Sequence, residues 1–182
     1  MALDAFLQFT KGGGVAAPEI EGETLDREMQ RLHPKPNTPF DIQNWSFGVS
    51  QDVNIGSATG GIGAGKVNFD PFKITKAIDK SSPYFFGTMC TGGHFEKATL
   101  MVRKAGAVAD QSGGIYLQFD FLLVFVTNVS WSHSDPAPTE EITFEYGALQ
   151  VGYKPQTRQG QLGALIQHAW SRVINTQDFK IE

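Results

Sequence analysis

The sequence predicts a mainly β protein with one short α-helix at about Ser82–Thr91, and composition is the first evidence. Aromatic residues are plentiful, with 14 Phe among 182 residues, charged residues make up only 19%, and Gly is abundant at 20. This mixture favours short strands and many turns over a helix bundle. Several stretches also alternate apolar and polar residues with a period of two, as strands with one buried face do. The length suits one domain, residues 1–182, with a sizeable core.

The first strand is expected over residues 1–10, where the apolar residues at 3, 5, 7 and 9 share one side. Gly12–Pro39 follows and is rich in Gly, Pro and charge, which predicts a long loop. Within this loop a turn or two of helix is possible at residues 24–32. Its apolar face would comprise Leu25, Met29 and Leu32. A loop this long in a compact domain is usually functional or disordered.

Residues 41–51 read as one strand with two different faces. One face carries Gln43, Trp45, Phe47 and Val49. The other face is small and polar and carries Asn44, Ser46, Gly48 and Ser50. The small polar face suits a smooth, wetted surface, although an ordinary solvent-exposed strand face remains the alternative.

Residues 60–106 predict strand, short helix, strand. The apolar residues up to Phe69 and those from Phe72 onward alternate in different phases, which indicates a bend or bulge at Asp70-Pro71. Ser81-Ser82-Pro83 favours a helix start in which a hydroxyl caps free N–H groups. Gly92-Gly93 favours its end. A second strand follows, in which Ala98, Leu100 and Val102 alternate with Lys97, Thr99, Met101 and Arg103.

Residues 107–114 are expected to be a turn, and residues 115–131 are the most apolar stretch. Residues 121–126 are apolar on both faces, which requires a second cover, either the helix or another subunit. Leu122, Val124 and Val126 are therefore candidate subunit-interface residues, together with Leu25, Met29 and Leu32.

The rest of the chain predicts two more strands. A loop is expected at 130–139, followed by strand residues 142–153 whose phase changes, so that a bulge near Gly147 is predicted. Residues 165–176 read as the last strand, and residues 177–182 as a short, loose C-terminal tail.

No arrangement of residues indicates catalysis, a cofactor or a metal, so we expect a structural protein rather than an enzyme. The four His residues are scattered without metal-ligand spacing. Cys90, the single cysteine, reads as a buried small apolar residue. Glu140-Glu141 could be a paired carboxylate site but reads better as a solvated strand end. Residues 60–66 spell G-x-x-x-x-G-K, yet Val67 stands where a P-loop needs Ser or Thr.

Charge and hydropathy limit the partners and the location. The net charge is −4 without a basic cluster, which argues against nucleic acid or an anionic membrane as a main partner. No apolar run reaches the ~18 residues of a membrane-spanning helix. Asp4 and the lack of a basic region argue against a signal peptide, so we expect synthesis in the cytoplasm.

Several motifs resemble one family, and they occur in order along the chain. They are M-A-L-D-A-F-L at 1–7, W-S-F-G at 45–48, G-A-G-K-V at 63–67, F-x-I-T-K at 72–76, I-D-K-S-S-P at 78–83, T-G-G-H at 91–94, A-T-L-M-V-R-K-A-G at 98–106 and V-G-Y-K-P-Q at 151–156. Together they resemble the Hcp family, the haemolysin-coregulated tube proteins of type VI secretion. The chain departs at Phe47, where the family commonly has Trp, at Gly12–Pro39, and after Arg172.

The resemblance implies a compact antiparallel β-barrel of two packed sheets that forms hexameric rings. The rings would stack into a hollow tube, leave the cell by sheath contraction without a signal peptide, and carry small effectors in the lumen. The implied partners are further copies of the chain, the contractile sheath, the spike protein at the tube tip and effector proteins. Asn44, Ser46, Gly48 and Ser50 would then face the lumen, and Gly12–Pro39 would pack on neighbouring subunits.

Three alternatives remain open from the sequence. A monomeric ligand-binding β-barrel would share the fold but form no ring. A P-loop NTPase would bind nucleotide with magnesium. A tail-tube protein of a phage-like particle is separated from the main interpretation only by the family motifs.

Overall fold

The computed structural model describes residues 3–10, 20–54, 63–104, 114–134, 137–157 and 161–182. Most of the predicted turn at 107–114, the start of the Gly12–Pro39 segment and the first three residues of G-x-x-x-x-G-K lie outside these ranges. The elements are β1 (Leu3–Thr10), α1 (Arg27–Leu32), β2 (Phe40–Ile42), β3 (Asn44–Ser46), β4 (Val49–Asn54), β5 (Gly63–Phe69), β6 (Phe72–Ala77), α2 (Ser82–Thr91), β7 (His94–Lys104), β8 (Ile115–Ser134), β9 (Ala137–Tyr153) and β10 (Ile166–Ser171).

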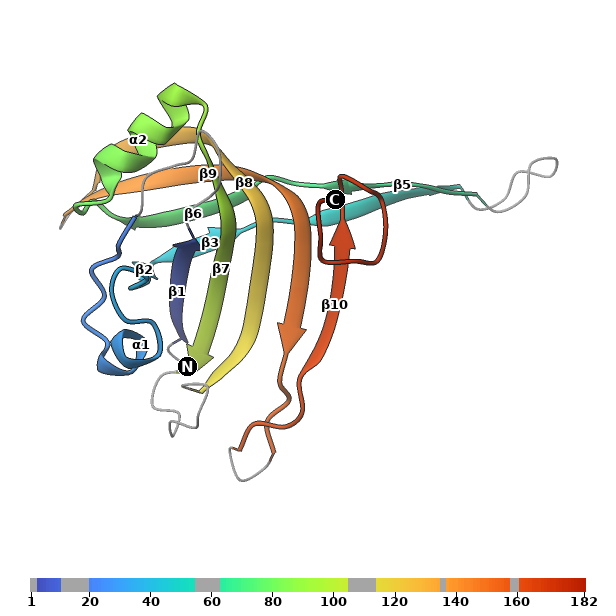
Figure 1. The fold of residues 1–182 in the computed structure, drawn as a ribbon, viewed down its shortest axis with the longest axis horizontal. Helices are drawn as coiled ribbons and strands as arrows, with labels where there is room; N and C mark the ends of the chain where they lie inside the picture. The colour runs from blue at the N-terminus through green and yellow to red at the C-terminus, as the bar shows by residue number, and fades with distance from the viewer. Residues whose placement is uncertain (1–2, 11–19, 55–62, 105–113, 135–136, 158–160) are drawn as a thin grey trace.

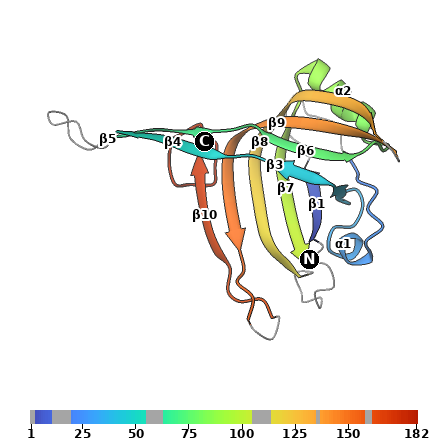
Figure 2. The ribbon, with the colours of Figure 1, turned by 180° about the vertical axis from the view of Figure 1, so that it is seen from behind.

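One antiparallel sheet curls into a nearly closed barrel (Figures 1 and 2). Its order is β2-β1-β7-β8-β9-β6-β3, and β10 pairs with the end of β9. The two edge strands, β2 and β3, are separated in sequence by Gln43 alone, whose N–H donates to the Thr75 carbonyl at 2.9 Å. The chain thus joins the two edges of its own sheet, which confirms the mainly β, barrel-like prediction.

Aromatic rings fill the barrel. The Phe9 centroid lies 4.6 Å from that of Phe95, 5.3 Å from Phe144 and 5.4 Å from Phe85. Phe85 comes from α2, which caps one end of the barrel, and it is fully buried. Buried aromatics contribute both apolar area and favourable ring geometry, so this cluster stabilises the barrel.

The helix α2 has the predicted bounds. It ends at Gly92, whose φ of 68° is the left-handed conformation that glycine tolerates. The predicted hydroxyl cap is wrong, because Ser81 makes no side-chain bond to the helix N–H groups and instead contacts the Asp79 carboxylate.

A second apolar cluster lies on the outer face of β1 and β7, under α1. Phe6, Met29, Met101 and Ile115 are buried there, and Leu32 packs at the edge. Met101 lies on the opposite face of β7 from Leu100 and Val102, as the alternation predicts, and its side chain is buried because α1 covers it. The possible helical turn at residues 24–32 is therefore real and has a packing role.

The strands β8 and β9 form one long hairpin, and both strands change phase midway. Leu123, with φ 53°, stands opposite Gly147. The alternation changes phase at Gly147, but the bulge predicted there is wrong, because the shift in register lies between Val126 and Asn128. The predicted loop at 130–139 is wrong, since Ser134 pairs with Ala137 and both strands extend into this region.

The strands β4 and β5 pair only with each other and project from the barrel as a separate two-stranded hairpin (Figures 1 and 2). The predicted single strand at 41–51 is therefore divided. Trp45 and Phe47 pack on the core as expected, whereas Val49 lies in the hairpin and is 51% exposed. The predicted break at Asp70-Pro71 is where the hairpin ends and β6 begins.

Candidate channel-lining face and subunit contacts

The outward face of four neighbouring strands carries small polar side chains. Strand register aligns Ser46 with Lys73, Thr75 with Glu141, and Glu141 with Ser130. We call this surface the polar strand face; it comprises Asn44, Ser46, Lys73, Thr75, Asn128, Ser130, Ser132, Thr139 and Glu141. Seven of these nine residues are Ser, Thr or Asn, and the other two have opposite charges. The result is a hydrated surface without apolar or strongly charged patches.

Two of the four predicted lumen residues, Asn44 and Ser46, lie on the polar strand face. Gly48 and Ser50 do not, because the chain leaves the barrel for the projecting hairpin after β3. A Cβ at Gly48 would lie 2.6 Å from Asp70 Oδ2, which is the end of an exposed side chain that can move aside. Sequence reasoning missed Asn128, Ser130 and Ser132, although their alternation with Val129 and Trp131 would have indicated a strand.

A buried polar cluster lies beneath this face, at the start of α2. Lys76 Nζ is 2.9 Å from Glu140 Oε1 and 2.8 Å from Asp79 Oδ1, and both Lys76 and Glu140 are essentially inaccessible. The Ser82 hydroxyl and the Trp131 indole N–H donate to Glu140 at 2.6 and 3.2 Å. The interpretation of Glu140 as a solvated strand end is therefore wrong. The cluster holds α2 on the barrel.

The six predicted interface residues differ in their exposure to solvent. Leu25 is 88% exposed, the highest value among the exposed large hydrophobics of the described residues. Met29, Val124 and Val126 are buried within the subunit itself, and Leu32 and Leu122 are partly buried. The second cover expected for β8 is thus provided by this subunit at 124 and 126. Leu25 is the residue of the six with the most surface to offer a neighbour.

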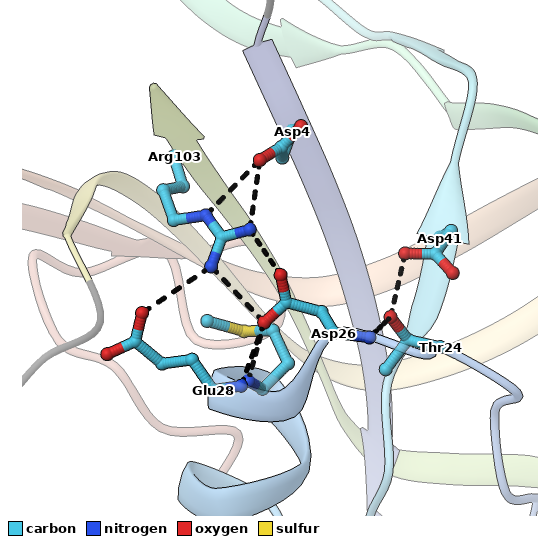
Figure 3. A network of polar contacts seen from close by, with 7 residues as sticks. Asp4, Thr24, Asp26, Glu28, Asp41 and Arg103 are labelled. Atoms are coloured by element: carbon cyan, nitrogen blue, oxygen red, sulfur yellow. Dashed lines mark hydrogen bonds and ion pairs between the residues drawn. The ribbon is translucent and has the colours of Figure 1, made fainter. Parts of the chain in front are cut away.

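Arg103 fixes the segment that carries Leu25. Its guanidinium, above the Phe6 ring, pairs with Asp4 at 2.9 Å, with Asp26 and with Glu28 at 3.6 Å (Figure 3). Asp26 also accepts from the N–H groups of Glu28 and Met29, capping α1.

The pKa values of two carboxylates around Arg103 are shifted in opposite directions. The hydrogen bond from Arg103 holds the pKa of Asp26 below its ordinary value. Burial raises the pKa of nearby Asp41, whose carboxylate accepts from the Thr24 hydroxyl at 2.8 Å.

The base of the projecting hairpin is held by a second arginine. We call Phe69, Glu145, Tyr146 and Arg172 the hairpin-base cluster. Arg172 Nη1 donates to Glu145 Oε2 at 2.8 Å and to the Tyr146 carbonyl at 2.7 Å. Its guanidinium lies over the Phe69 and Tyr146 rings, and the Tyr146 hydroxyl donates to the Asp70 carbonyl at 3.2 Å. Burial raises the pKa of Tyr146 to about 12.

Within the described ranges, no group of three or more His, Cys, Asp or Glu is arranged to hold a metal ion. Over the same residues, no helix has the length and apolar character to span a membrane. Cys90 is exposed on α2, so its predicted burial is wrong.

Comparison with known proteins identifies the family. The sequence matches the family described as "Type VI secretion system effector, Hcp" over residues 6–153. The chain belongs to the Hcp family. It is 31% identical over 113 residues to protein Hcp1 of Pseudomonas aeruginosa, covering 62% of this chain and 69% of that protein. Hcp proteins are structural, secreted tube proteins of type VI secretion, not a known family of enzymes, and they self-assemble into oligomeric rings.

Solved Hcp structures share the fold. A type six secretion system protein superimposes with a TM-score of 0.80 at 19% identity, covering 97% of this chain and 100% of that one. Hcp1 from Salmonella typhimurium gives a TM-score of 0.70 at 23% identity, covering 98% of this chain and 100% of the other. The curled sheet with α2 at one end is therefore the Hcp fold.

Proposed function

We propose that this tube protein forms closed hexameric rings whose channel is lined by the polar strand face. The composition of that face carries the proposal. Ser, Thr and Asn hold a water layer without offering apolar or strongly charged binding patches, which suits a channel through which other proteins must pass. Rings would stack into a hollow tube, leave the cell when the sheath contracts, and carry small effectors inside.

The ring requires two unlike surfaces on each subunit, and the chain offers suitable ones. In a closed ring each subunit meets its neighbours through a heterologous contact. The projecting hairpin supplies one candidate, since Val49 and Val53 are about half-exposed and an isolated two-stranded hairpin is marginally stable by itself. Leu25 on the Gly12–Pro39 segment supplies another. Both gain stability if a second copy covers them.

The monomeric carrier is less well supported. A ligand-binding barrel needs an interior cavity, but the interior here is occupied by packed rings such as Phe72 and Phe121, whose centroids are 4.6 Å apart. A ligand would have to displace these side chains. The P-loop alternative also loses support, because β5, a strand rather than a helix, contains Lys66.

The mass of the purified protein tests the ring. Light scattering after size exclusion should give a stable mass near six chains of 19.9 kDa, and electron microscopy should show a central hole. A mass of one chain at all concentrations would contradict the proposal.

A gold label tests the lining. In a Cys90→Ala background, Ser46→Cys or Ser130→Cys labelled with maleimide gold should place density inside the hole. Unmodified protein, labelled at exposed Cys90 on α2, serves as the comparison site. Density on the outer rim from Ser46→Cys would assign the polar strand face to the outside of the ring.

A further inference from the structure

We infer that Arg172 is a positioning residue that sets the direction of the projecting hairpin and thereby controls ring assembly. The inference rests on the proposed function, because it concerns how the ring-forming subunit presents one of its contact surfaces. Arg172 belongs to the chain after residue 153, where the family match ends.

Among the described residues, β4 and β5 pair only with each other, so no strand of the main sheet fixes the angle of the hairpin. The chain enters through Gly48 and leaves through Asp70, which are joined by a backbone hydrogen bond of 2.9 Å. A two-stranded ribbon held at such a junction can pivot unless side chains brace its base.

The hairpin-base cluster supplies that brace. Phe69, the last residue of β5, lies edge-on to Tyr146 at 6.4 Å between ring centroids, and Arg172 lies 5.6 Å from the Phe69 centroid. Arg172 is in turn anchored at two points of β9, the Glu145 carboxylate and the Tyr146 carbonyl. A planar guanidinium can make these contacts together, whereas lysine cannot stack in the same way.

The C-terminal segment is itself fixed on β9. The Arg172 N–H donates to the Gly147 carbonyl at 2.8 Å, and Ser171 pairs with Thr176. At Gly147 a Cβ would lie 3.1 Å from Val173 and 3.3 Å from Ile181, so the turn after β10 and the chain end both lie close against this strand. The guanidinium is therefore presented from a rigid support, and only part of it reaches solvent.

Spin labels measure the hairpin direction without reference to rings. In the Cys90→Ala background, Lys66→Cys on β5 and Gln167→Cys on β10 are both exposed and report the distance from hairpin to barrel. The labelled chain is mixed with excess unlabelled chain, so that only distances within one subunit contribute. We expect one narrow distance distribution with Arg172 present. Arg172→Gln should broaden it about twofold, since the hairpin alone is marginally stable.

The control variants separate positioning from general damage. Arg172→Lys should restore the distribution in part, because it keeps the charge beside Glu145 but not the stacking. Lys180→Gln removes an exposed ion pair with Asp178 in the same C-terminal segment and should leave the distribution unchanged. If Arg172→Gln unfolds the chain, Phe69→Leu tests the same brace from the other side. An unchanged distribution in Arg172→Gln or Phe69→Leu would overturn the inference.

The ring mass then tests whether the direction of the hairpin affects assembly. Arg172→Gln should shift the light-scattering mass below that of the parent at the same concentration, whereas Lys180→Gln should keep the parent value. If Arg172→Gln has a broadened distance distribution but the full ring mass, the link to assembly is overturned. A parent protein that forms no rings would instead contradict the proposed function, while the distance measurement still decides the role of Arg172.

Discussion

Lys76 and Glu140 face each other across β6 and β9 with almost no solvent contact. Lys76→Met would leave the Glu140 carboxylate buried without its counter-charge. We expect a loss of about 3–5 kcal/mol in the free energy of unfolding, which urea denaturation would measure. The double variant Lys76→Met/Glu140→Leu should recover most of this loss, because both charges are then gone.

The matched control is Lys80→Met, which breaks the ion pair of a half-exposed lysine with Glu21. Its urea midpoint should barely change, as for most surface pairs. Equal midpoints for Lys76→Met and Lys80→Met would show that the buried pair adds nothing to the fold.

The Thr88 hydroxyl lowers the stability of the fold, unlike the buried pair of Lys76 and Glu140. Its hydroxyl is buried on α2 and has no hydrogen-bond partner among the described residues. Thr88→Val keeps the shape and removes the unsatisfied group, so we expect a gain of about 1 kcal/mol, measured by thermal unfolding. Thr91→Val on the same helix should give no gain, since that hydroxyl donates to the Gly87 carbonyl at 3.0 Å. A less stable Thr88→Val would contradict the assignment.

The carboxylates near Arg103 predict two opposite pH dependences. The pKa of Asp26 is lowered from 3.8, so its charge stabilises the fold above that value, and the benefit is lost as pH falls through its folded pKa. Asp26→Asn should therefore destabilise at pH 7 by about 1 kcal/mol and progressively less in acid. Asn remains a good helix cap, so the difference reports the charge alone.

The pKa of Asp41 is raised from 3.8, so its charge costs stability once pH rises above that value. Asp41→Asn should stabilise at pH 7 and lose its advantage as pH falls below about 4. Urea midpoints at pH 3.5 to 7 for both variants check the signs. Parallel curves for the two variants would refute the assignment.

At the scale of an element, α1 and the segment before it contain one residue needed for folding and another available for assembly. Met29 is fully buried under it, whereas Leu25, in the segment leading into it, is 88% exposed. Met29→Ala should cost about 2–5 kcal/mol of unfolding free energy. Leu25→Ala should leave that value unchanged and, if Leu25 contacts a neighbour, reduce the light-scattering mass. A large stability loss in Leu25→Ala would contradict its exposed position.

Elements with local signals could be predicted from the sequence. The helix α2 has Ser-Ser-Pro at its start and a left-handed Gly92 at its end, and Asp70-Pro71 divides β5 from β6. These signals act within a few residues, where side-chain chemistry decides the backbone conformation. The outward position of Asn44 and Ser46 could be predicted from simple alternation for the same reason.

Features that depend on distant segments could not be predicted. By alternation Met101 lies on the outer face of β7, and its side chain is buried because α1 covers it. Glu140 looks solvated in the sequence, since Lys76, Ser82 and Trp131 surround it only after folding. The strand character of 130–134 was hidden by two prolines nearby, although pairing with β9 continues to Ser134.

Barrel closure belongs to the whole molecule, and the backbone N–H of Gln43 takes part in it beside the pairing of β3 with β6. Gln43→Pro removes the N–H that donates to Thr75 and leaves this carbonyl unpaired. We expect a loss of about 1–3 kcal/mol in the free energy of unfolding. Gln43→Ala keeps the backbone donor and changes only an exposed side chain, so its urea midpoint should match the parent. Equal midpoints for both variants would show that closure does not need this bond.

The pairing of β1 with β7 has a consequence for synthesis on the ribosome. Translation proceeds at about 5–20 residues per second, so β1 emerges roughly 5–20 seconds before β7 is complete. During that interval the short β2 is the strand partner of β1 that has already been made, and Phe6, Leu7 and Phe9 lack the cover of β7. Nascent chains stalled well short of β7 should be cleaved rapidly by protease at β1, and chains stalled well beyond β9 should not. This barrel therefore spends its first seconds with its N-terminal strand in need of protection.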